Sequence, residues 1–140
     1  MTNTNRIIIL ISLAALLLWS NFSIGDDSSD SEQARAVIDN YMSALVSGDT
    51  DTIIDLLGGH FLVQRRQILN NVEYSNLLQE RYQSLRYEIA TETVLSGSRW
   101  AFKTHLYFGN EDQMTLLLTI KKSDHQDEVI YEIIDEKTIN

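Results

Sequence analysis

The hydrophobic period of this chain changes once, near Ser84, and that change constrains the fold more than any other feature of the sequence. Before Ser84, apolar residues recur every three to four positions, which is the period of an amphipathic helix. After Ser84 they alternate with polar residues, which is the period of a half-buried strand. Helical segments followed by strands are typical of an α+β domain. We therefore expect three N-terminal helices packed on a curved four-stranded antiparallel sheet.

Capping residues and glycines indicate where the first two helices begin and end. Ser29 and Glu32 form a capping box at the start of the first helix, and Gly48 stops it. Asp49 caps a second, shorter helix that ends at Gly58. In both helices the apolar residues recur at helical spacing, so both are expected to pack on one core.

The rest of the domain divides at segments of polar and small residues. Residues 61–82 predict one or two further helices, with a break at Asn70-Asn71. Three segments of turn composition, at residues 96–98, 109–112 and 123–127, then separate four alternating stretches. Connections this short predict that the four strands pair as an antiparallel meander.

The first 25 residues read as an export segment. Arg6 precedes an apolar run from Ile7 to Trp19, and polar residues follow it, which is the pattern of a secretory signal cleaved before Asp26. An uncleaved membrane anchor is the alternative, although residues 7–24 reach the roughly 20 residues of a spanning helix only by including polar side chains. We expect an exported protein, either periplasmic or secreted, or one anchored to the membrane by this segment.

Composition narrows the classes of partner and chemistry. The chain has 11 Lys and Arg residues against 20 Asp and Glu residues, so it repels phosphate backbones and nucleic acid is not an expected partner. The absence of cysteine excludes disulfides, cysteine-based zinc sites and thiol nucleophiles, and it suits a bacterial envelope. After the signal, residues 26–31 read as an acidic linker and residues 32–140 as one domain.

The stretch from Val37 to Leu57, VIDNYMSALVSGDTDTIIDLL, resembles the opening of nuclear transport factor 2-like domains. That superfamily includes the ketosteroid isomerases and the SnoaL-type polyketide cyclases. Its usual start is a helix that ends in Gly-Asp-x-Asp, followed by a short apolar helix, and the resemblance spans Glu32 to Asp135. It implies a cone-shaped domain. Enzymes, ligand binders and interaction modules all share this fold, so the resemblance leaves the function open.

The resemblance to the isomerases can be tested position by position. It implies that Tyr41 matches the tyrosine that donates to the developing oxyanion. The position of the catalytic base falls near Arg65, and an arginine cannot abstract a proton at neutral pH. We find no acid on the inward faces of the predicted strands, where Thr104, Leu116 and Leu118 lie. We therefore expect Tyr41 to be a core tyrosine and the protein not to be an isomerase.

Three residues are candidates for ligand binding near the opening of the implied cone: Tyr41, His60 and Arg65. His60 could act as a general base, since an unperturbed histidine titrates at about 6.5, and a surface histidine is the alternative. Arg65 could hold a carboxylate or another anion with two parallel hydrogen bonds, and a salt bridge on the helix surface is the alternative. The three histidines share no metal-ligand spacing, so we expect no metal and no cofactor.

One predicted strand has a polar face that mixes aromatic and basic side chains: Arg99, Lys103, His105 and Tyr107. This mixture suits a protein interface. The resemblance implies that such sheets dimerise through this side, so a homodimer is one expectation and simple exposure to solvent is the other.

No catalytic apparatus is evident in the sequence. We therefore predict an exported domain that binds a small ligand, apolar or anionic, or interacts with a protein. The first alternative is an enzyme of isomerase, cyclase or hydrolase type with a non-standard site. The second is a structural or interaction domain tethered to the membrane by its N-terminal segment.

Overall fold

The computed structural model describes residues 26–109 and 111–140. The first 25 residues, on which the predicted signal or anchor falls, and Asn110 lie outside the described residues. The chain divides into two units, residues 1–32 and residues 33–140, and the packing described below is that of the second unit. Among the residues described, no helix is both long enough and apolar enough to cross a membrane.

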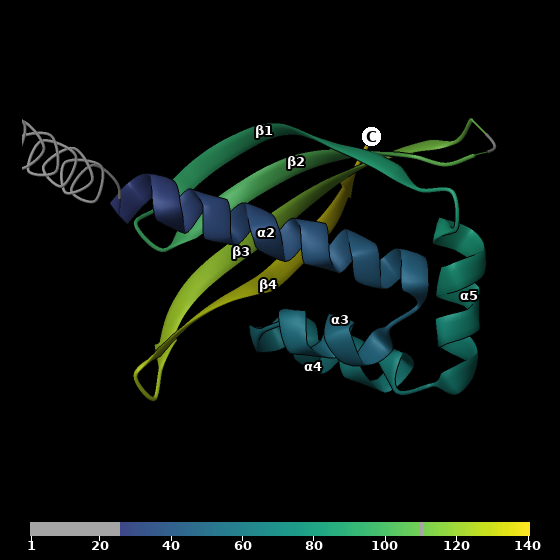
Figure 1. Ribbon diagram of the computed structural model, residues 1–140, viewed down its shortest axis with the longest axis horizontal. Helices are drawn as coiled ribbons and strands as arrows, with labels where there is room; N and C mark the ends of the chain where they lie inside the picture. The colour runs from purple at the N-terminus through teal and green to yellow at the C-terminus, as the bar shows by residue number, and fades with distance from the viewer. Residues whose placement is uncertain (1–25, 110) are drawn as a thin grey trace, which may run out of the picture. The chain divides into compact units, whose positions relative to one another are not determined.

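The described part of the chain is an α+β protein, as the sequence predicts (Figure 1). The helices are α2 (Asp26–Ser47), α3 (Thr50–Leu56), α4 (Gly59–Leu69) and α5 (Val72–Tyr82). The strands are β1 (Arg86–Ser96), β2 (Arg99–Tyr107), β3 (Gln113–His125) and β4 (Glu128–Ile139). The strands form one antiparallel sheet in the order β1-β2-β3-β4, which is a meander.

The start of α2 differs from the prediction. The helix is already formed at Asp26, the first described residue, so Ser29 lies inside the helix and does not cap its start. Residues 26–31 are therefore helical. They contain no apolar residue, so no helical period could be found in this stretch.

The junction between α2 and α3 has the form that its sequence indicates. Gly48 has a φ of +66°, the left-handed conformation that glycine adopts most easily. The N–H of Gly48 donates to Leu45 O and that of Asp49 to Ala44 O, which is the Schellman arrangement at a helix end. The Asp49 carboxylate then caps α3 by accepting from the backbone N–H of Thr52 at 3.1 Å.

Residues 59–82 form two helices, so the structure has four described helices where we expected three. The two helices separate at the predicted break. Asn70 ends α4, and the Asn71 side chain caps α5 by accepting from the backbone N–H of Glu73 at 3.0 Å. Of the one or two helices expected in this segment, the structure shows two, so the expected total of three helices was one too few.

The turn between β3 and β4 is tighter than its composition suggests. β3 continues through His125, and only Gln126 and Asp127 form the turn. Both have positive φ, +51° and +70°, as in the two-residue turns that match the twist of a hairpin. The predicted turn over residues 123–127 was too wide, because exposed polar residues at the end of a hairpin have the composition of a turn.

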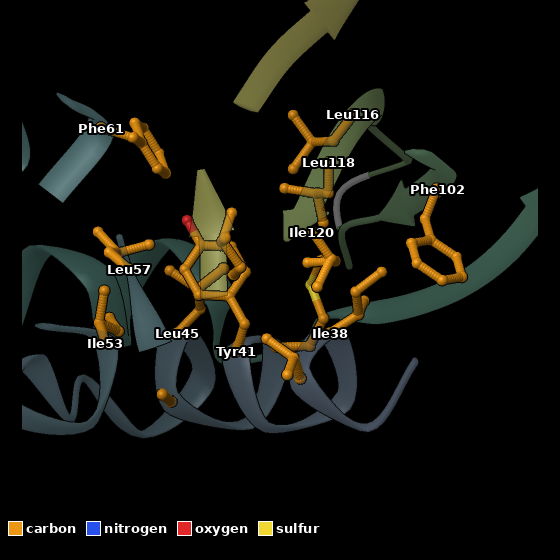
Figure 2. Packing of buried hydrophobic residues seen from close by; sticks show 14 of the residues in the cluster. Ile38, Tyr41, Leu45, Ile53, Leu57, Phe61, Phe102, Leu116, Leu118 and Ile120 are labelled. Carbon is orange, nitrogen blue, oxygen red and sulfur yellow. The ribbon is translucent and has the colours of Figure 1, made fainter. Parts of the chain in front are cut away.

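The sheet has one face covered by helices and one face without them. The covered side, here called the inner face, carries the buried side chains Trp100, Phe102, Thr104, Leu106, Leu116, Leu118, Ile120 and Ile133. All four helices contribute buried residues to the same core, and Figure 2 shows Leu57 and Phe61 on one side of Tyr41, with Leu118 and Ile120 on the other. The alternate residues of the strands form the outer face.

Candidate functional site

A polar cluster lies at the edge of the apolar core, where Tyr41 is buried and the Arg65 side chain is 41% exposed. Tyr41 rises from α2 into the space between the helices and the sheet (Figure 2). Its hydroxyl donates to Glu136 Oε2 of β4 at 2.6 Å. The guanidinium of Arg65, from α4, donates to the other carboxylate oxygen of Glu136 at 3.4 Å. The structure therefore brings two of the three predicted ligand-binding residues together, with one carboxylate between them.

The inward position of Glu136 was not predicted from the sequence. The prediction that no acidic side chain lies on the inner face of the sheet was therefore wrong. Strict alternation after Ile133 would place Glu136 on the outer face. The pairing shifts, however: Ile133 lies opposite Ile120, whereas Asp135 lies opposite Thr119, so Ile134 is an extra residue in β4. Such a bulge reverses the side that every later residue faces. The two consecutive isoleucines were the only sign of it in the sequence.

The cluster fixes the protonation state of Tyr41. Burial is the main cause that raises the pKa of Tyr41 well above its usual value, and the charge and hydrogen bond of Glu136 raise it further. The positive charge of Arg65 opposes this shift but does not reverse it. Tyr41 therefore stays protonated at neutral pH and acts as a hydrogen-bond donor, not as a base.

The space beside this cluster is too small for a ligand. The cavity between α2, α3, α4 and α5 has a volume of about 20 Å³ and is lined by Tyr41, Tyr74, Arg65 and six apolar side chains. A water molecule needs a cavity of about 10–15 Å³, whereas sites for small molecules occupy roughly 300–1,000 Å³. The interior as it stands can hold one water molecule and cannot hold a substrate.

His60 lies away from the cluster. It is exposed in the first turn of α4, and its Nε2 is 2.9 Å from the side-chain nitrogen of Gln64, one helical turn further on. Arg66, next to Arg65, is also exposed, as expected for neighbours that point about 100° apart on a helix. Of the three candidates for ligand binding, the structure brings only Tyr41 and Arg65 together.

A wider groove opens on the surface between α5 and the β2–β3 hairpin. Its volume is about 960 Å³, and its lining includes Leu77, Arg81, Phe108 and Met114. The guanidinium carbon of Arg81 lies 5.3 Å from the centre of the Phe108 ring and 5.9 Å from that of Tyr82. The groove is large enough for a small molecule, but both of its acidic lining residues, Glu80 and Asp112, oppose an anion.

The four predicted interface residues lie together on the outer face, along β2. Arg99 is exposed, and Lys103, His105 and Tyr107 are half-buried among their neighbours. The Nδ1 atom of His105 lies 2.9 Å from the hydroxyl of Thr115 on β3. The position of these residues on one uncovered face is the arrangement that their alternation predicts.

Within residues 26–109 and 111–140, no group of three His, Asp or Glu side chains is placed to hold a metal ion.

Comparison of the chain with models of known protein families gives no match. Comparison with curated proteins gives no significant match either. The geometry of the interior and of the outer face therefore carries the argument about function.

Proposed function

We propose that this protein is an exported interaction domain that binds another protein through its surface and catalyses no reaction. The packed interior is the observation that carries this proposal. The cavity beside Tyr41 is about 20 Å³, more than tenfold smaller than the roughly 300 Å³ at which small-molecule sites begin. We therefore expect a binding partner to be recognised at the surface of the domain.

The outer face of the sheet is the surface that best fits this role. The helices of the domain pack on the inner face, so none of the elements in residues 33–140 covers the outer one (Figure 1). Protein interfaces are enriched in aromatic residues and arginine, and this face carries Tyr107 and Arg99 on the same strand. Strands paired in a sheet also hold such side chains at fixed spacing, which limits the entropy lost on binding.

Native mass spectrometry of the protein recovered from the envelope of its own cells tests the proposal. We expect the mass of the polypeptide, alone or in complex with a second protein. A retained small molecule would contradict the proposal. If one is retained, the variants Phe61→Trp, beside the interior cavity, and Met114→Trp, in the surface groove, show which space releases it.

An enzyme is the second candidate function, and the cluster of Tyr41, Glu136 and Arg65 is the observation that favours it. A buried tyrosine with a raised pKa, next to a carboxylate, is a combination found at active sites. Catalysis would need an open state that admits a substrate. Relaxation dispersion of the Ile53 and Leu57 methyl groups detects such a state on the millisecond scale. We expect no exchange, and a populated open state would favour the enzyme.

A further inference from the structure

The outer face of the sheet has the opposite charge to the rest of the chain. Over the paired residues of the four strands, the outer face carries five basic residues and four acidic ones. The rest of the chain then holds six basic residues against sixteen acidic ones. An acidic protein therefore presents one locally positive face.

The positive charge is arranged in rows across the strands. Lys103 of β2, Leu117 of β3 and Lys137 of β4 lie opposite one another in a single row, so a cation stands on each side of an apolar residue. Lys137 is already paired with Asp135 at 3.4 Å, in an exposed ion pair. Lys103, at the centre of the sheet, has no carboxylate within ion-pair distance among the described residues.

A second row places like charges in direct contact positions. Arg99 of β2 lies opposite Lys121 of β3, and Glu132 of β4 lies on the other side of Lys121. Within the described chain neither Arg99 nor Lys121 has an ion pair. Like charges that face each other across neighbouring strands destabilise a sheet. An anion bound between Arg99 and Lys121, on the side away from Glu132, would reduce the repulsion and gain two charge-assisted contacts.

Two other possible binding partners, a second copy of this chain and an anionic membrane, match the charge of this face less well than an acidic protein segment does. A second copy bound in the usual two-fold way would bring this face, with its one excess positive charge, against itself, so net charge gives no attraction between the two copies. An anionic bilayer is a plane wider than the face, so the acidic residues around the face would be repelled by the same membrane. A short acidic segment of a protein can contact the cations alone.

We propose that the outer face, centred on Lys103, binds an acidic segment of a partner protein. This inference rests on the proposed function and names the chemistry of the partner. The carboxylates of that segment lie over Lys103, Arg99 and Lys121, and the exposed edge of Leu117 contacts an apolar part of it. Because the contacts are charged and half-exposed, binding weakens as salt rises.

Binding of the full chain to poly-L-glutamate at low salt tests this inference. We expect Lys103→Glu to weaken the binding roughly tenfold, because it reverses a central charge of the face. Arg66→Glu is the matched control: it changes the net charge by the same amount on exposed Arg66 of α4, and we expect less than about a twofold change. Circular dichroism and urea unfolding of both variants show whether the fold is kept.

Each other result overturns the inference. Equal weakening by the two variants would mean that only net charge matters. Binding to vesicles that contain phosphatidylglycerol but not to poly-L-glutamate, lost in Lys103→Glu, would make this a lipid-binding face. A dimer in analytical ultracentrifugation that Lys103→Glu dissociates would make the second copy its occupant. A small molecule retained in native mass spectrometry would contradict the proposed function itself, independently of these outcomes.

Discussion

A single carboxylate, that of Glu136, determines the chemistry of the interior. Its side chain is 16% exposed and accepts hydrogen bonds from Tyr41 and Arg65. A buried carboxylate is costly unless its charge is paired and its oxygens are hydrogen-bonded, and here both oxygens have a donor. The three side chains therefore stabilise one another, and the removal of one leaves the others without partners.

The variant Glu136→Ala tests whether the three side chains depend on one another. The control is Asp135→Ala, which changes the neighbouring residue on the outer face. The first variant leaves the Tyr41 hydroxyl and the Arg65 guanidinium without their acceptor, so we expect a loss of about 1–3 kcal/mol in the free energy of unfolding. The second removes only an exposed ion pair with Lys137 and should cost less than about 1 kcal/mol. Urea unfolding measures both. Equal losses would contradict the placement of Glu136 on the inner face beside Tyr41.

The raised pKa of Tyr41 predicts how stability changes at high pH. A proton held more tightly in the folded state stabilises the protein fully below the unfolded pKa of about 10, and this contribution is lost as the pH rises through the folded pKa. The loss is absent in Tyr41→Phe. Between about pH 9 and pH 11 we expect the free energy of unfolding to fall more steeply in the wild type. The pKa of Tyr87, raised to about 12, contributes equally to both proteins. Parallel curves would contradict the role of Tyr41.

Thr104 is the buried polar residue that the described structure leaves unsatisfied. It is fully buried on β2, and its hydroxyl has no hydrogen-bond partner within residues 26–109 and 111–140. Valine has nearly the same shape without the hydroxyl. We expect Thr104→Val to raise the free energy of unfolding by about 1 kcal/mol in urea titrations. A loss of stability would show that the hydroxyl is satisfied in solution.

At the scale of the elements, the sequence predicts what depends on local chemistry. Asp49 and Asn71 cap helices because their side chains bond to backbone groups two or three residues away. The alternation of β2 and β3 also predicts correctly that Thr104 and Leu118 face inward. These features need no knowledge of the distant chain.

The features that escaped prediction depend on pairing between strands. The extra residue at Ile134 is defined only by the register of β4 against β3, and that register places Glu136 beside Tyr41. The contact joins residues 95 positions apart. For the same reason, the size of the cavity could not be predicted, since it depends on how closely the helices pack on the sheet.

The end of α2 provides a test at this scale. A Cβ atom on Gly48 would lie 2.5 Å from the carbonyl oxygen of Ser75, and its φ of +66° already disfavours any other residue. We expect Gly48→Ala to lower the free energy of unfolding by more than about 1 kcal/mol. Gly97 has open space around it, so Gly97→Ala should change the stability by less than about 0.5 kcal/mol. Thermal and urea unfolding compare the two, and similar losses would contradict this account of the junction.

At the scale of the whole molecule, we propose that the interior and the outer face have separate roles. The interior stabilises the fold and leaves about 20 Å³ unfilled. The outer face has no cover from the elements of residues 33–140 and is positive in a chain whose net charge is −9. We expect the net acidity to repel nucleic acid, and we propose that the local positive patch selects an acidic partner.

Site-specific photocrosslinking in the cells that produce the protein tests most directly whether the outer face is the binding surface. A photoreactive phenylalanine analogue at Tyr107 samples that face, and the same analogue at His60 samples the exposed surface of α4. We predict a covalent complex with a protein from position 107, lost when Lys103→Glu is added, and none from position 60. Complexes from position 60 alone, or from neither position, would contradict the account.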